Sequence, residues 1–162
     1  MGEKAKDVVI WVEDMQGTIS DARAYIKEIY NFEVFMSSTA FELADLLEEY
    51  SNRVLCIILD IMLFSVQDLV DIGIDNSGTS LGHAAGWIIA ESFLLKNDGY
   101  KNIPILFYSA RSLQPEDEKK LEELKKLTTA KIDYIEKTSF DRQNFKYWKE
   151  KISDFINAVK KP

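Results

Sequence analysis

The chain has 162 residues, 46% of them hydrophobic, and a formal net charge of -7 at pH 7. This length suits one domain with a substantial core, and the acidic balance argues against a surface that binds nucleic acid directly. The single cysteine, Cys56, excludes an internal disulfide and a cysteine metal site. Because no apolar run resembles a signal segment or a membrane span, we expect a cytoplasmic protein without membrane insertion.

Predicted strands and helices alternate along the chain. Apolar runs predict strands over 7–14, 32–36, 54–60, 103–108 and 131–136. Helical spacing predicts helices from Thr18 or Ser20 to Tyr30, from Ser38 to about Tyr50, from about Gly82 toward Gly99, from Pro115 onward, and after a cap at Asp141. This order indicates an α/β fold, in which helices cover both faces of a parallel sheet and the strands share one carboxyl edge.

Apolar residues at helical spacing mark the helix faces that we expect to be buried. They are Ile19, Ala22, Ile26 and Ile29 in the first helix, Phe41, Ala44 and Leu47 in the second, Leu121, Leu124 and Leu127 in the charged helix, and Phe145, Trp148, Ile152, Phe155, Ile156 and Val159 in the last. Cys56, inside the third strand, should pack as a small hydrophobic residue.

One segment, 63–81, breaks the alternation. It mixes apolar residues with acids and glycines, and it allows a short helix over 65–71 followed by a turn at Asp-Asn-Ser-Gly. A connection of this length inside one domain indicates a functional loop, a lid or a mobile segment rather than an ordinary connection. Two interpretations remain open, a lid that restricts access to the neighbouring strand ends and a surface elaboration.

Polar side chains follow four of the predicted strands. Glu13 and Asp14 end the first strand, Asp60 the third, Ser109 the fourth and Lys137 the fifth. Because parallel strands present their carboxyl ends at one edge, where open α/β sheets bind ligands, these groups should converge.

Three converging carboxylates need a counter-charge. At about 5 Å separation each pair repels by roughly 3 kcal/mol for an effective dielectric constant of about 20. A hard cation such as Mg²⁺, which prefers one or two carboxylates together with a phosphate, relieves this repulsion. One carboxylate can then attack phosphorus, while Ser109 binds a phosphoryl oxygen and Lys137 neutralises its charge.

The motifs Val-Glu-Asp, Leu-Asp-Ile-Met, Tyr-Ser-Ala and Tyr-Ile-Glu-Lys stand at these strand ends in chain order. In this order the sequence resembles the receiver domain of bacterial two-component response regulators over essentially its whole length. The resemblance implies a flavodoxin-like, doubly wound sheet of five strands in the order 2-1-3-4-5. It also implies one receiver domain over 1–162, with an inserted loop at about 63–81 and no output domain.

The resemblance also implies roles for the residues of the acidic edge. Asp60 corresponds to the phosphorylated aspartate, and Asp14 to a direct Mg²⁺ ligand that Glu13 assists through water. The backbone carbonyl of Met62 corresponds to a further metal ligand.

The remaining positions correspond to residues that respond to phosphorylation. Ser109 is the hydroxyl that moves toward the phosphoryl group, Lys137 pairs with that group, and Tyr134 is the aromatic switch. Two prolines that are usual in the family are replaced here by Phe64 and Thr138. The peptide bond after the lysine is usually cis in the family, but a cis bond before a residue other than proline is costly, so the second replacement argues against it.

We expect this protein to act as a phosphoprotein in a Mg²⁺-dependent phosphorelay rather than as an enzyme that turns over a substrate. A sensor histidine kinase or phosphotransfer protein supplies the phosphoryl group, and the output is contact with another protein, by a monomer or a phosphorylation-dependent dimer. The alternative is a receiver-like interaction module that works without phosphorylation. An aspartyl phosphatase fits less well, because Met62 stands where that class needs a second aspartate.

Overall fold

The structure is a computed structural model, and it describes residues 6–63, 67–74, 84–137 and 145–160. Its elements are β1 (Val8–Val12), η1 (Gln16–Ile19), α1 (Ser20–Tyr30), β2 (Glu33–Ser37), α2 (Ala40–Tyr50), β3 (Val54–Leu59), α3 (Gln67–Asp71), α4 (Ala85–Ile89), η2 (Ala90–Leu94), β4 (Ile105–Ser109), α5 (Pro115–Lys125), β5 (Ile132–Glu136) and α6 (Phe145–Val159). No helix within these ranges is long and apolar enough to cross a membrane.

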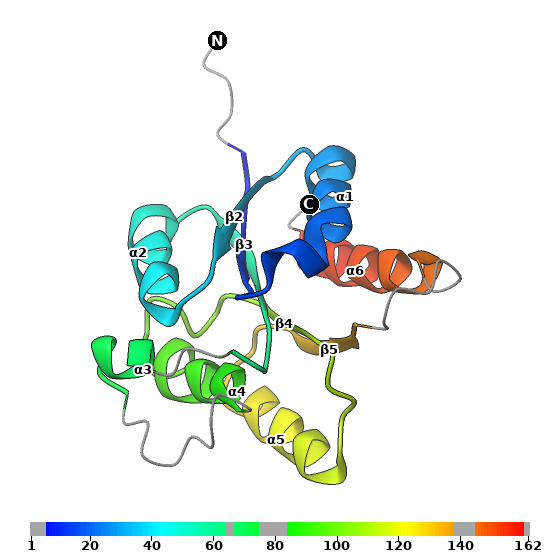
Figure 1. The fold of residues 1–162 in the computed structure, drawn as a ribbon. Helices are drawn as coiled ribbons and strands as arrows, with labels where there is room; N and C mark the ends of the chain where they lie inside the picture. Colours follow the sequence, from blue (N-terminus) through cyan, green and yellow to red (C-terminus); the bar gives the residue numbers. More distant parts are fainter. Residues whose placement is uncertain (1–5, 64–66, 75–83, 138–144, 161–162) are drawn as a thin grey trace.

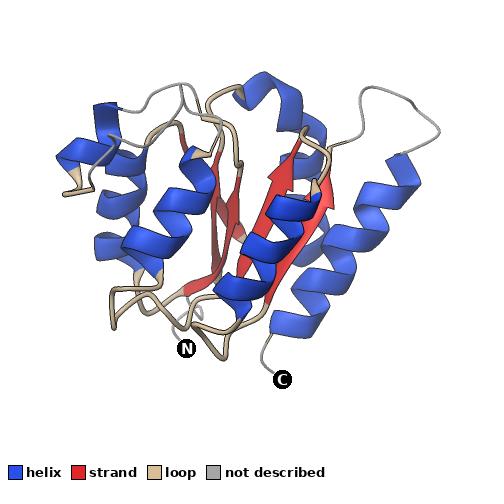
Figure 2. Cartoon of the chain, turned by 90° about the horizontal axis from the view of Figure 1, so that it is seen from below, coloured by secondary structure: helices blue, strands red, loops and turns tan. Residues whose placement is uncertain are grey.

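The strands form one five-stranded sheet in the order β2-β1-β3-β4-β5, and every neighbouring pair is parallel. This confirms the predicted doubly wound fold and its strand order. The sheet lies between helices on both sides (Figure 2). All five strands therefore end at the same edge, which places the polar groups that follow them together.

Alternate residues of the central strands are buried on opposite faces of the sheet. In β1, Ile10 belongs to a cluster with residues of α2, α3, α4 and α5, whereas Trp11 belongs to a cluster with residues of α1 and α6. These two groups of helices lie on opposite sides of the sheet (Figure 1). Cys56 of β3 is fully buried in the second cluster, as predicted, and burial raises the pKa of its thiol to about 12. Burial on both faces explains the unbroken apolar runs of these strands.

Three predictions about buried helix faces are wrong. Ile29, Phe41 and Leu127 are 61%, 50% and 53% exposed. In α2 the buried residues are instead Ala40, Leu43 and Leu47. Because an α-helix has 3.6 residues per turn, residues three apart along the whole helix drift off one face, whereas alternating steps of three and four stay on it. Leu127 lies beyond the last residue of α5.

Helix ends also differ from the predictions. Ser20 is the first residue of α1 rather than its cap, because η1 runs directly into the helix. The second helix begins at Ala40, and Thr39 caps it by accepting a hydrogen bond of 3.1 Å from the amide of Glu42.

After α4 the chain continues as a wider π-helical turn, η2, in which the amide of Leu95 donates to the carbonyl of Ala90.

The segment between β3 and α4 is partly described. The predicted short helix is present as α3, which packs on α2 and buries Leu69, and Ile74 is also buried in the core. This described part makes an apolar contact with the body of the domain. The predicted turn, Thr138 and the Asp141 cap lie outside the described residues, as does the rest of the proposed lid.

Candidate functional site

The backbone extends the sheet just past the strand ends and so aligns the polar groups. The amide of Asp60 donates to the carbonyl of Val12 at 3.0 Å, and the amide of Lys137 donates to the carbonyl of Ser109 at 2.7 Å. The residues after β1 and β3 are thus fixed side by side, as are those after β4 and β5. The side chains predicted to share this edge therefore start from neighbouring backbone positions.

Three carboxylates gather at the ends of β1 and β3. One oxygen from each of Glu13, Asp14 and Asp60 lies within 4.8 Å of the others. Glu13 is 1% and Asp60 5% exposed, whereas Asp14 is half-buried. Burial removes most of the water that would screen these charges, so their repulsion is strong.

Lys137 partly balances the three acids. Its Nζ donates a 2.7 Å hydrogen bond to Oδ2 of Asp60 and a second hydrogen bond to Oε2 of Glu13. Only 13% of the lysine side chain is exposed. One amine beside three carboxylates still leaves an excess of negative charge, and this excess favours a bound cation.

The other oxygen of Asp60 accepts two hydrogen bonds from neutral groups. Ser109, which is fully buried, donates from Oγ to Oδ1 at 2.7 Å, and the backbone amide of Met62 donates to the same oxygen at 3.1 Å. Together with Lys137 these donors fix the orientation of the carboxylate. Ser109 and Lys137 thus meet at the aspartate that was predicted to be the phosphoacceptor.

Glu13 is the titratable group most affected by this arrangement. Burial is the main cause that raises its pKa from 4.5 to about 7, and the charge of Asp60 adds to the increase. The hydrogen bond from Lys137 acts in the opposite direction. The amide of Met15 also donates to Glu13 Oε1 at 2.9 Å. A cation at this position would favour the ionised form of Glu13.

The donor set fits Mg²⁺. Carboxylate oxygens are the hard ligands that this ion prefers, and a few carboxylates leave room for the waters and the phosphate that complete its coordination. Glu13, Asp14 and Asp60 supply these oxygens from two adjacent strand ends. The predicted ligand role of the Met62 carbonyl stays a prediction.

Tyr134 lies beside the loop that connects β4 to α5. Its hydroxyl donates to the backbone carbonyl of Arg111, two residues after Ser109. The ring is half-buried against the core cluster that α5 shares, and burial raises the pKa of the hydroxyl. The predicted switch residue is therefore attached to the loop that directly follows the predicted phosphoryl-binding serine.

Two further residues matter here, and the sequence analysis left only the second of them without a role. A Cβ at Gly86 would overlap the carbonyl of Asp60 and lie 2.6 Å from Cα of Ile61, so only glycine lets α4 pack on the end of β3. The second residue is Asp117, a buried acid in the first turn of α5. Its sequence signal is an acid at the third helical position, where capping residues occur.

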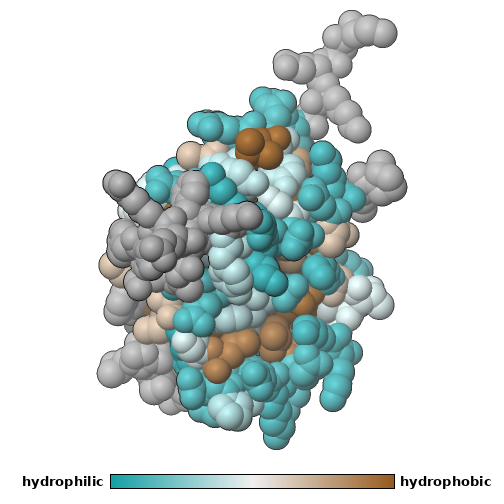
Figure 3. All heavy atoms as spheres, turned by 90° about the vertical axis from the view of Figure 1, so that its right-hand side faces the viewer, coloured by the Kyte–Doolittle hydropathy of each residue, from teal (hydrophilic) through white to brown (hydrophobic). Residues whose placement is uncertain are grey.

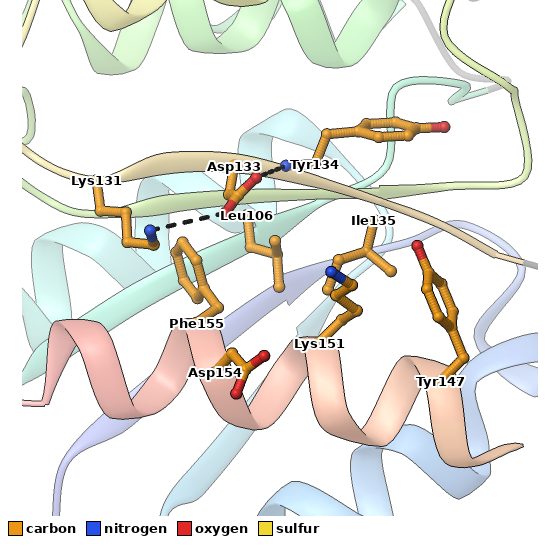
Figure 4. A pocket seen from close by; sticks show the side chains of 9 residues that line it. All are labelled: Leu106, Lys131, Asp133, Tyr134, Ile135, Tyr147, Lys151, Asp154 and Phe155. Carbon is orange, nitrogen blue, oxygen red and sulfur yellow. Dashed lines mark hydrogen bonds and ion pairs between the residues drawn. The ribbon is translucent and has the colours of Figure 1, made fainter.

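A shallow cleft of about 200 Å³ lies between β5 and α6 (Figure 4). Of the predicted site residues only Tyr134 borders it, and the Tyr134 side chain points away from the α6 residues in this view. Lysines and aspartates alternate around the cleft. The surrounding face, at the β5 edge of the sheet, is mainly hydrophilic, with hydrophobic side chains gathered in small areas (Figure 3).

Comparison with known proteins gives a consistent fold. No family model and no curated protein matches the sequence. Among solved structures, the phosphorylated cyanobacterial phytochrome response regulator RcpA is 21% identical, with a TM-score of 0.64 over 97% of this chain and 98% of that one. A two-component response regulator from Legionella pneumophila is 14% identical, with a TM-score of 0.57 over 94% and 99%.

A third solved structure is the N-terminal domain of a response regulator receiver protein from Methanoculleus marisnigri. It is 18% identical, with a TM-score of 0.55 over 88% of this chain and 94% of that one. The chain therefore has the fold of response regulator receiver domains, as its strand-end motifs predicted.

Proposed function

We propose that this protein is the receiver of a phosphorelay, in which Asp60 accepts a phosphoryl group from a sensor histidine kinase or a phosphotransfer protein. The observation that carries the proposal is the environment of the Asp60 carboxylate. A buried hydroxyl donates to one of its oxygens, a partly buried amine donates to the other, and two further acids lie within 4.8 Å. Each of these groups has a part in phosphoryl transfer to a carboxylate.

In the proposed step a carboxylate oxygen of Asp60 attacks the phosphorus of a phosphohistidine. The new bond joins that oxygen to phosphorus, while the phosphorus–nitrogen bond breaks and the donor imidazole leaves with the electron pair. The product is an acyl phosphate on Asp60. The hydrogen bonds from Ser109 and the Met62 amide orient the carboxylate for this attack.

Charge is the main obstacle to the step, because an anionic phosphoryl group must approach anionic side chains. Glu13, Asp14 and Asp60 would hold Mg²⁺, with the Met62 carbonyl as a further ligand, and the bound ion would neutralise the phosphoryl oxygens. Lys137 supplies a second positive charge from the end of β5 and pairs with the phosphoryl group once it is attached.

The output of the proposed receiver is a change in its surface. Ser109 leads directly into the β4–α5 connection, and Tyr134 donates to a carbonyl of that connection, so a new bond from Ser109 to a phosphoryl oxygen is transmitted to that loop and to β5. The surface built by β4, α5, β5 and α6 then favours a protein partner in one of two states. The protein thus signals by contact rather than by turnover.

Phosphorylation of the intact protein tests this proposal. The protein is incubated with Mg²⁺ and a small acyl-phosphate donor, and the intact mass is measured. We expect the wild type to gain one phosphate and Asp60→Asn to gain none. Asp98→Asn is the matched control, because Asp98 is an exposed acid in the turn before β4, and this variant should be phosphorylated like the wild type.

Other outcomes would contradict the proposal. Equal phosphate uptake by the wild type and by Asp60→Asn would place the acceptor elsewhere. No uptake by the wild type, with Mg²⁺ present, would favour the alternative of an interaction module that works without phosphorylation. Uptake that persists undiminished in a metal chelator would reject the role assigned to the three acids.

A further inference from the structure

Asp117 is a buried acid outside the site described above. It is 4% exposed, and within the described part of the chain the only other charged residues buried to this degree are Glu13 and Asp60. Its neighbours on α5, Glu116 and Glu118, are exposed. Burying a carboxylate costs free energy unless specific partners stabilise its charge, so Asp117 must have such partners.

Both oxygens of Asp117 accept hydrogen bonds from the β4–α5 loop. The guanidinium of Arg111 donates to Oδ1 at 2.9 Å, and the backbone amide of Gln114 donates to Oδ2 at 3.0 Å. The amide contact belongs to the cap of α5, but the arginine contact is not needed to begin a helix. It joins the middle of the loop to the first turn of α5 by an ion pair that is mostly shielded from water.

Arg111 also connects the loop to the candidate site. Its backbone carbonyl accepts the hydrogen bond from the Tyr134 hydroxyl, and it lies two residues after Ser109, which donates to Asp60. One residue is thus held by α5 through its side chain and by β5 through its carbonyl. Movement of Arg111 would displace the backbone next to Ser109.

We propose that Asp117 is a positioning residue, which acts through Arg111 to hold the β4–α5 loop in place. The held loop keeps the hydrogen bond from Ser109 to Asp60 and the hydrogen bond from Tyr134 to the Arg111 carbonyl. The effect of this positioning on phosphoryl binding rests on the proposed function. The position of the loop itself does not, because all of these contacts exist without a phosphoryl group.

The first experiment measures loop order in the unphosphorylated protein without metal. Asp117→Asn keeps an oxygen for the Gln114 amide but loses the charge that holds the guanidinium, and Arg111→Gln breaks the pair from the other side. We expect amide hydrogen exchange over 110–114 to increase about tenfold in both variants, because a charge-assisted hydrogen bond is lost. Glu118→Gln, an exposed acid in the same turn, is the control and should not change it.

A purely capping role predicts a different pattern. In that case Asp117→Ala would increase exchange, whereas Asp117→Asn and Arg111→Gln would match the wild type. That result would overturn the inference, and so would an equal increase in Glu118→Gln. Because two variants break the same contact from opposite sides, poor folding of either one still leaves the other to decide.

The second experiment separates positioning from general damage. Beryllofluoride is used as a phosphoryl mimic, and its affinity in the presence of Mg²⁺ is compared with the affinity for Mg²⁺ alone. We expect Asp117→Asn and Arg111→Gln to weaken beryllofluoride binding about fivefold and to leave Mg²⁺ binding unchanged, because the three acids lie outside the loop. Equal weakening of both ligands would overturn the inference.

The two experiments distinguish a failure of the proposed function from a failure of the positioning role. If the wild type binds no beryllofluoride, the proposed function fails, while hydrogen exchange still decides whether Asp117 orders the loop. If the wild type binds it and the variants show neither a looser loop nor weaker binding, the positioning role fails and the proposed function stands.

Discussion

Two regions meet at Asp60, and they hold it by different physical means. At the ends of β1, β3 and β5, three carboxylates and one amine are packed together with an excess of negative charge. On the other side, Ser109 at the end of β4 contributes a neutral hydroxyl, and the loop that follows it is held by a balanced ion pair and by the hydroxyl of Tyr134.

The difference separates the part of the site that binds a cation from the part that holds the site residues in place. The acidic side is under electrostatic repulsion until a cation or a proton arrives, so its energy depends on pH and metal. The charged and polar groups of the β4–α5 loop are already paired, so this loop serves to hold Ser109 in position beside Asp60. Substitutions on the two sides should therefore respond differently to pH and Mg²⁺.

Lys137→Met should have the largest effect. It removes the amine that contacts Glu13 and Asp60, and breaking a buried charge pair from one side costs about 3–5 kcal/mol. We expect the free energy of unfolding to fall by that amount in a chelator at mildly alkaline pH, and Mg²⁺ to restore part of it. Chemical denaturation measures both values.

Lys119→Met is the matched control for this prediction, because the Lys119 side chain is 79% exposed. It should change stability by less than about 0.5 kcal/mol. A loss in Lys137→Met that Mg²⁺ does not reduce would mean that repulsion among the acids is not the cause.

Glu13→Gln should change the pH dependence of stability. Because the folded protein raises the pKa of Glu13 from 4.5 to about 7, it binds more protons than the unfolded chain within this range. The free energy of unfolding therefore falls as pH rises through the same range, by up to about 3 kcal/mol without metal. Glu13→Gln removes this contribution, so its stability relative to the wild type should rise with pH.

Denaturation at a series of pH values measures this difference, and Glu28→Gln, at an exposed position on α1, provides the control. Parallel stability curves for Glu13→Gln and the wild type would show that Glu13 does not titrate in this range.

Ser109→Ala should have a smaller effect that is insensitive to ionic conditions. The substitution removes a buried hydrogen bond to a carboxylate, which is worth about 2 kcal/mol. Since the lost donor is neutral, the decrease in unfolding free energy should be similar at low and high salt. Ser112→Ala, at an exposed serine of the loop that follows β4, should cost less. A strong salt dependence of the Ser109→Ala effect would contradict the contrast between the two regions.

Tyr134→Phe should have the smallest effect, a loss of about 1 kcal/mol. It removes the hydroxyl that donates to the Arg111 carbonyl and keeps the ring. Because burial raises the pKa of this hydroxyl, it stays protonated and the loss should not vary with pH near neutrality. Tyr147→Phe, at an exposed tyrosine of α6, is the control. Equal stability of Tyr134→Phe and the wild type would show that the hydrogen bond contributes nothing.

The polar residues at the strand ends could be predicted because their positions follow from topology. An apolar run that ends in Asp60 marks a buried parallel strand, and parallel strands share one carboxyl edge. The alternation of strands and helices then brings Glu13, Asp14, Ser109 and Lys137 to the same edge without knowledge of any contact. The structure places these residues as that argument requires.

Buried helix faces were harder to predict, because helix position depends on packing. Phe41 and Ile29 have the spacing of core residues and are nevertheless exposed. In α2 the Thr39 cap fixes where the helix starts, and the face that meets the sheet then contains Ala40 and Leu43. Spacing identifies a helix, but it does not determine how the helix is rotated on the sheet.

The sequence by itself determined the fold class, the strand order through its family resemblance, and the set of polar residues at the carboxyl edge, since these depend on local patterns and on the rules of parallel sheets. Only the tertiary structure decided which oxygen of Asp60 each donor contacts, why Gly86 must lack a side chain, and that Asp117 holds Arg111. These features depend on distances of a few ångströms between segments far apart in the chain, which local patterns do not specify.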